Sequence, residues 1–167
     1  MSAASEEPQR LTIVAAGPDD VGTVLSFIGQ LAEYEKLEHE LQVNEALLRE
    51  HLFGARPSAE VIVARVEGRA VGFALFFPTF STFVGRPGIW LEDLFVQADQ
   101  RGKGIGRALL RHVAGLAVDR QCGRLEWSVL DWNAPAIGFY RELGARPMDD
   151  WTTQRVTGDT LLRLAGR

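Results

Sequence analysis

A glycine-rich turn is the feature of this sequence best suited to bind a ligand. It runs Arg101-Gly-Lys-Gly-Ile-Gly106, and apolar residues follow it at helical spacing. Glycine lets backbone N–H groups approach a ligand, and the first N–H groups of a helix lack intrahelical partners and carry partial positive charge. The turn therefore favours an anion, most readily phosphate, and Arg101, Lys103 and Arg107 add formal positive charge around it.

Two common phosphate-binding loops do not fit this turn. A Walker A loop has Ser or Thr after its Gly-Lys pair, whereas Lys103 is followed by Gly104. The glycines at 102, 104 and 106 also lack the GxGxxG spacing of a dinucleotide-binding fold. A purely structural reading stays open, in which the glycines only make a tight connection between a strand and a helix.

The segment before the turn is an apolar strand that two carboxylates interrupt. Residues 89–96 are otherwise apolar almost throughout, which is typical of a strand inside a sheet. Because side chains alternate along a strand, we expect Glu92 on one face beside Trp90 and Asp93 on the other face beside Leu91. A buried carboxylate is costly unless it is paired, and burial is expected to raise the pKa of Glu92.

Strand and turn together resemble the acetyl-CoA signature of the GNAT superfamily of N-acetyltransferases. Arg101, Gly104 and Gly106 match its motif Arg/Gln-x-x-Gly-x-Gly/Ala, and Trp-Leu-Glu-Asp-Leu-Phe-Val resembles the strand of the diamine N-acetyltransferases, which acetylate spermidine, spermine or thialysine. Residues 132–145 are similar to the C-terminal coenzyme motif of that subfamily. The resemblance spans about residues 11–164 and implies transfer of the acetyl group of acetyl-CoA to a primary amine of a small cationic substrate.

The resemblance also implies roles for individual residues. Glu92 would take a proton from the amine, directly or through a water, because only about one alkylamine in a thousand is neutral at pH 7. Tyr140 would supply a proton or hydrogen bond to the departing thiolate. The amine would be bound by Tyr34, Glu35, Glu92 and Asp93. The coenzyme would be bound by Leu94, Phe95, Val96, Arg101, Gly102, Lys103, Gly104, Ile105, Gly106, Arg107, Asn133, Ala136 and Tyr140.

Each of these residues also has an ordinary structural reading. Tyr34 and Glu35 lie in an acid-rich stretch that resembles a solvated helix end. Tyr140 lies on the apolar face of its helix and suits core packing with a satisfied hydroxyl group. Glu92 could pair with a structural cation.

The composition limits the functions open to the chain. With 167 residues, of which 46% are hydrophobic, we expect one domain at 11–165 and a disordered tail at 1–10. The net charge of −4 argues against nucleic acid, and the single Cys122 suits a reducing compartment. We expect a cytoplasmic protein, because no apolar run reaches the length of a membrane span and no signal peptide is apparent. The three histidines lack the spacing of metal ligands, so no metal is expected.

The expected fold is an α/β mixed sheet flanked by helices, in the order βααβββαβαββ, which fits the GNAT acyl-CoA N-acyltransferase fold. Strands are expected at 11–14, 61–66, 70–77, 89–96, 124–130, 145–155 and 159–164, and helices at 21–34, 44–54, 104–119 and 133–144. Residues 78–87 are expected to form a loop. Within that fold, the strands at 89–96 and 124–130 would be parallel and would splay apart to admit the coenzyme. The apolar C-terminal strands and the resemblance together predict a homodimer.

Two other functions stay open at this stage. One is a catalytically silent acyl-CoA-binding or interaction module with the same fold. The other is an acetyltransferase of the same superfamily that acts on another amine, such as an amino acid, a protein N-terminus or a lysine. The joint presence of Glu92 and Tyr140 favours an enzyme.

Overall fold

The computed structural model describes residues 10–167 and divides into two compact units, one ending at Ser128 and the other comprising Val129–Arg167. The tail expected at 1–10 falls outside the described residues, apart from Arg10. That residues 11–165 act as one acetyltransferase domain stays a prediction. Among the described residues, no helix is long and apolar enough to cross a membrane.

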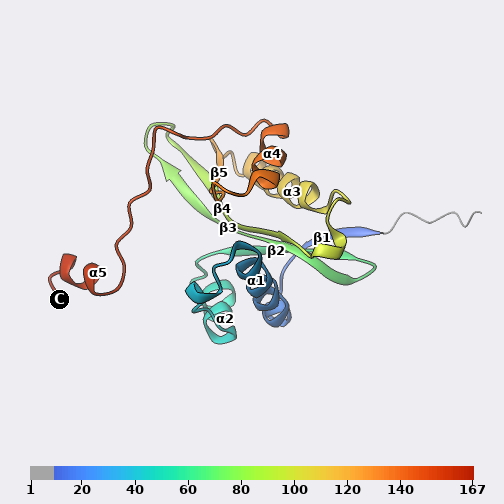
Figure 1. Cartoon of the computed structure of the whole chain (residues 1–167), viewed down its shortest axis with the longest axis horizontal. Helices are drawn as coiled ribbons and strands as arrows, with labels where there is room; N and C mark the ends of the chain where they lie inside the picture. Colours follow the sequence, from blue (N-terminus) through green and yellow to red (C-terminus); the bar gives the residue numbers. More distant parts are fainter. Residues whose placement is uncertain (1–9) are drawn as a thin grey trace, which may run out of the picture. The chain divides into compact units, whose positions relative to one another are not determined.

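The first unit is a five-stranded mixed sheet with helices on both faces (Figure 1). The sheet has the order β1-β2-β3-β4-β5, in which the first four strands are antiparallel and β4 and β5 are parallel. This confirms the expected fold class and the parallel pair. The elements are β1 (Leu11–Ala15), η1 (Pro18–Asp20), α1 (Val21–Glu35), η2 (Glu38–Glu40), α2 (Glu45–Phe53), β2 (Glu60–Val66), β3 (Arg69–Ser81), β4 (Arg86–Val96), η3 (Ala98–Gln100), α3 (Ile105–Asp119) and β5 (Leu125–Trp127).

The main core lies between the sheet and the helices α1 and α2, which cover one face, while α3 covers the other (Figure 1). Phe73 of β3 and Phe95 of β4 pack on Phe27 of α1, with ring centres 5.9 and 5.7 Å from that of Phe27. Full burial of each such ring contributes roughly 1.5–3 kcal/mol. The rings fix α1 across the strand that precedes the glycine-rich turn.

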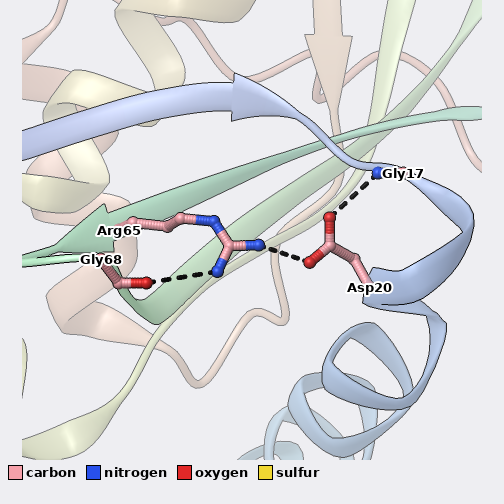
Figure 2. Close-up of polar contacts among 4 residues, drawn as sticks. All are labelled: Gly17, Asp20, Arg65 and Gly68. Carbon is pink, nitrogen blue, oxygen red and sulfur yellow. Dashed lines mark hydrogen bonds and ion pairs between the residues drawn. The ribbon is translucent and has the colours of Figure 1, made fainter.

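The start of α1 is tied to the hairpin of β2 and β3 by polar contacts (Figure 2). Arg65 forms a part-buried ion pair with Asp20, and its guanidinium also donates to the Gly68 carbonyl, 3.4 Å away. Asp20 in turn accepts a hydrogen bond of 2.9 Å from the Gly17 N–H. These contacts hold the N-terminal end of α1 on the sheet, while its other end carries Tyr34 and Glu35.

The prediction of a loop at 78–87 is wrong. β3 continues to Ser81 and β4 begins at Arg86, so only a turn at 82–85 separates them. The pairing of β3 with β2 ends at Phe76, so the far part of β3 has a single strand neighbour. A proline is tolerated there, since on such a strand the missing N–H of Pro78 need not break a ladder of hydrogen bonds.

The second unit contains two helices, α4 (Ala134–Glu142) and α5 (Gly158–Leu164). The strands predicted at 145–155 and 159–164 are wrong, because residues 145–157 form no strand and the second segment is helical. Thr157 stands at the N-cap of α5, with Asp159 in its first turn and Arg163 in its last turn. The acidic residue at the start and the basic residue at the end both suit the dipole of a helix.

Candidate functional site

A β-bulge in β4 shapes the region around the two carboxylates. In the register with β3, Asp93 faces Leu75 and Leu91 faces Phe76, so Glu92 is the extra residue without a partner. Two residues then stand opposite one, which bends the strand and shifts its alternation by one position. The prediction that Asp93 lies beside Leu91 is therefore wrong, because the two residues lie on opposite faces.

The bulge brings both carboxylates to one face of the sheet. Trp90, opposite Phe77, and Asp93, opposite Leu75, lie on the face that α1 covers. Glu92 is exposed, and its carboxylate accepts a hydrogen bond of 2.8 Å from the Trp90 indole N–H. The expected burial of Glu92 is thus wrong, because the extra residue of a bulge turns away from the regular packing.

Asp93 is the carboxyl group with the perturbed proton affinity. Its side chain is half-buried, and burial, followed by the negative charges of Glu92 and Glu35, raises the pKa of Asp93 to about 7. Burial also raises the pKa of Glu35, at the end of α1. Because charge repulsion requires proximity, Glu35, Glu92 and Asp93 form one group, which we call the carboxylate group.

β4 and β5 part where the bulge begins. They pair only at Ile89 with Leu125, Trp90 with Glu126 and Leu91 with Trp127. From residue 92 to Val96, β4 has no described strand partner on the side away from β3. This open edge contains Leu94, Phe95 and Val96, so it offers backbone groups for sheet-like pairing with an extended ligand.

The glycine-rich turn leads from this edge into α3. Gly102 and Gly104 have φ values of +75° and +81°, a left-handed conformation that glycine adopts without strain. A Cβ added at either position would meet no atom within 4 Å, so the space above both glycines is open. The first N–H groups of α3, from Ile105 onward, lie next to that space and suit an anion.

The two cations at the start of the turn already have partners. The Lys103 ammonium donates to the Gln100 side chain, 3.0 Å away. The Arg101 Nε donates to the Val96 carbonyl at 2.9 Å, and the guanidinium lies 4.7 Å from the ring centre of Tyr34. Tyr34 is therefore in contact with the turn, and the charge of Glu35 is close enough to Asp93 to raise the pKa of Asp93, so the two residues are more than a solvated helix end.

Three predicted site residues lie in the second unit. The buried Asn133 caps α4 by accepting a hydrogen bond of 3.3 Å from the Ala136 N–H, which confirms its predicted capping role. Tyr140 is half-buried near the end of α4, with its ring centre 5.3 Å from that of Phe139. Their contribution to the coenzyme site and to the chemistry stays a prediction.

The sequence did not predict two features of this site. It gave no signal for the bulge, since Trp-Leu-Glu-Asp-Leu-Phe-Val contains neither Gly nor Pro. Nor did it predict the contact between Arg101 and Tyr34, which are 67 positions apart, although an arginine and a tyrosine are a common cation–π pair. Among the described residues, no group of three or more His, Cys, Asp and Glu side chains is placed to hold a metal ion.

Comparison with known proteins identifies the family. The profile of the acetyltransferase (GNAT) family matches residues 28–145. A thialysine N-epsilon-acetyltransferase of Sus scrofa is 37% identical over 159 residues, covering 89% of this chain and 93% of the pig protein. The L-ornithine N5-acetyltransferase of Arabidopsis thaliana is 31% identical over 191 residues, covering 87% of this chain and 84% of the plant protein.

Comparison with solved structures also finds proteins of the same fold. The solved structure of an integron cassette protein from the mobile metagenome of V. cholerae matches with a TM-score of 0.78 and 28% identity, covering 94% of this chain and 98% of that chain. The family match extends over the sheet edge, the bulge and the glycine-rich turn that carry the site. This chain therefore belongs to the GNAT family of acetyltransferases, as its turn and strand predicted, and is an acetyl-transferring enzyme.

Proposed function

We propose that the enzyme transfers the acetyl group of acetyl-CoA to a primary amine of a small cationic substrate, such as thialysine, ornithine or a diamine or polyamine. The observation that carries this proposal is the carboxylate group beside the open edge of β4. Two or three neighbouring negative charges attract a substrate that carries one ammonium group to be acetylated and a second that stays charged. The relatives that act on thialysine and ornithine support the same substrate class.

The residues present fit acetyl-CoA. The open space above Gly102 and Gly104 and the first N–H groups of α3 suit its pyrophosphate, together with the charges of Lys103 and Arg107. The open edge of β4 at Leu94–Val96 suits the amide-containing arm, which pairs with a strand as a peptide does. When bound there, acetyl-CoA supplies the activated acetyl group.

Proton removal from the amine is assigned to the two neighbouring carboxylates. The sequence assigns this role to Glu92 because of its expected burial, but the more buried of the two carboxyl groups is that of Asp93. We therefore propose that Glu92, exposed and oriented by Trp90, pairs with the incoming ammonium group, and that Asp93 accepts the proton directly or through a water. A base whose pKa is near the working pH suits this task best.

Tyr140 is proposed as the group that donates to the departing thiolate. A phenol with an ordinary pKa near 10 can supply a proton or a hydrogen bond at neutral pH. The support for this role is the similarity of residues 132–145 to the coenzyme motif of the diamine acetyltransferases. Asn133 and Ala136 of the same motif are proposed as coenzyme contacts.

We also propose that the enzyme is a cytoplasmic homodimer. The C-terminal strands first invoked for the dimer are absent, but this part of the chain has large apolar side chains in solvent. Met148, Trp151 and Leu164 are 63%, 74% and 73% exposed. Such side chains favour a second copy of the chain as a cover. A monomeric mass by light scattering at micromolar concentration contradicts the dimer.

The function is tested by measuring thiol release from acetyl-CoA against a panel of amines. We expect amine-dependent release with thialysine, ornithine or diamines, and much less with neutral or acidic amino acids, because those lack the second cationic group. Release that is equal for cationic and acidic amines contradicts the role of the carboxylate group. Coenzyme binding with no release from any amine contradicts the proposed transfer to an amine.

A further inference from the structure

Arg101, the first residue of the glycine-rich turn, connects three parts of the first unit. Its Nε donates to the Val96 carbonyl at the end of β4, 2.9 Å away. Its guanidinium carbon lies 4.7 Å from the ring centre of Tyr34 in α1 and 5.6 Å from that of Phe95 in β4. Both distances are within the range of about 6 Å in which a cation is attracted to an aromatic face.

These contacts make Arg101 a poor match for the role of a simple positive charge on the turn. The guanidinium is engaged with a backbone oxygen and two aromatic faces, and one of those rings, Phe95, is 5% exposed and packs on Phe27. A planar guanidinium can donate in its plane while its faces stack on aromatic rings, which the compact ammonium of lysine cannot do. This set of contacts therefore requires an arginine.

Tyr34 is the residue that Arg101 positions through these contacts. Tyr34 is 38% exposed at the end of α1, and the next residue, Glu35, belongs to the carboxylate group. The start of α1 is fixed on the sheet by Asp20 and Arg65, so Arg101 supplies a separate contact at the opposite end of the helix. The amine side of the site and the coenzyme turn thus meet at one side chain.

We propose that Arg101 is a positioning residue for the amine site: by lying over Tyr34 while bonded to the end of β4, it couples occupancy of the glycine-rich turn to the placement of Tyr34 and Glu35. This inference rests on the proposed function and goes beyond it, because it gives a residue of the coenzyme turn an effect on the amine. It also means that one face of the Tyr34 ring is covered by Arg101, so the charge of the substrate is recognised mainly by carboxylates.

The test is steady-state kinetics of the full chain with Arg101→Lys, which keeps the charge but loses the planar donor. We expect KM for thialysine or a diamine to rise roughly 5–10-fold, and KM for acetyl-CoA to change by less than about threefold. Lys103→Ala is the matched control, since it removes a cation from the same turn. It should raise KM for acetyl-CoA and leave KM for the amine within about twofold.

A double-mutant cycle identifies the route of the effect. If Arg101 acts through Tyr34, Arg101→Lys should add nothing to the amine KM of Tyr34→Leu, because the ring that it positions is already gone. The proposal is overturned if the two effects on the amine KM multiply. It is equally overturned if Arg101→Lys weakens acetyl-CoA and leaves the amine KM unchanged, since Arg101 would then be an ordinary anion-binding residue.

Hydrogen exchange tests the coupling without catalysis. The amides of Lys36 and Leu37 donate to the carbonyls of Glu33 and Ala32 at the end of α1, at 3.1 and 2.8 Å. We expect saturating coenzyme A to slow their exchange roughly 5–10-fold in the wild type and to have no such effect in Arg101→Lys. Equal slowing in both proteins contradicts the proposal. If exchange slows only in the wild type and no amine is acetylated, the proposed substrate is refuted. The proposed coupling through Arg101 is then still supported.

Discussion

Replacing Asp93 by asparagine should stabilise the protein and impair catalysis at the same time. Burial and two neighbouring carboxylates raise the pKa of Asp93 from 3.8 to about 7. Between these pH values the folded protein keeps a proton that the unfolded chain has released, so the folded state binds more protons. Its stability therefore falls as the pH rises from the lower value to the higher one, and then stays level. Asparagine is neutral at every pH, so the variant does not lose this stability as the pH rises.

The size of the effect follows from the shift in pKa. A difference of about 3 units at about 1.36 kcal/mol per unit gives about 4 kcal/mol at about pH 8.5, where both states of the wild type are ionised. At about pH 5.5 the folded protein is still protonated at Asp93, and the same relation gives about 2 kcal/mol. The gain in free energy of unfolding should thus about double between these two pH values.

The gain is measured by urea unfolding of the wild type and Asp93→Asn at both pH values, followed by tryptophan fluorescence. Asp99→Asn is the matched control: Asp99 is exposed, and its hydrogen bond with Gln100 and its contact with Arg69 lower its pKa, so this change should give no gain that grows with pH. If Asp93 accepts the proton, kcat of Asp93→Asn should fall roughly 10²-fold or more. A variant less stable than the wild type at the higher pH, or a gain independent of pH, refutes the reasoning about Asp93.

Three other changes test the remaining parts of the site. Gly104→Asp should weaken acetyl-CoA binding in calorimetry by roughly tenfold or more beyond Gly104→Asn, a variant of equal size that shares the strain of the positive φ; equal affinities contradict an anion site at the turn. Glu92→Gln should mainly raise the amine KM if Glu92 pairs with the ammonium group, whereas a fall in kcat of roughly 10²–10⁴ would restore it as the proton acceptor. Tyr140→Phe should lower kcat and leave the acid limb of the pH profile in place, and a shifted acid limb contradicts its role as donor to the thiolate.

Local chemistry decided much of the site before any packing was considered. The glycines of the turn are required wherever φ is positive, and Gly102 and Gly104 adopt such values. Asn44 caps α2 by accepting from the Leu47 N–H at 3.0 Å, and Asn133 caps α4 in the same way. These interactions span only three residues, so the sequence contains everything needed to predict them.

The sequence also predicted the hairpin and the strand of the site, but not where regular pairing ends. An alternating or apolar pattern states which residues suit a strand, whereas the extent of a strand depends on the neighbour that pairs with it. β3 and β4 extend beyond the predicted limits because each is the other's neighbour. The segment at 145–155 has strand-like residues and forms no strand, which its residue pattern alone does not reveal.

The surroundings of the two carboxylates were decided by tertiary structure alone. Glu92 and Asp93 are adjacent in an apolar strand, and alternation predicts only that they point to opposite faces. One unpaired residue opposite Leu75 and Phe76 changes that outcome: it exposes Glu92, directs Asp93 toward α1 and sets it near Glu35, 58 positions earlier in the chain. A bulge depends on the register between two strands, and a pKa depends on the charges and solvent around a group. Both are properties of neighbours in space, which the order of residues along a single strand does not specify.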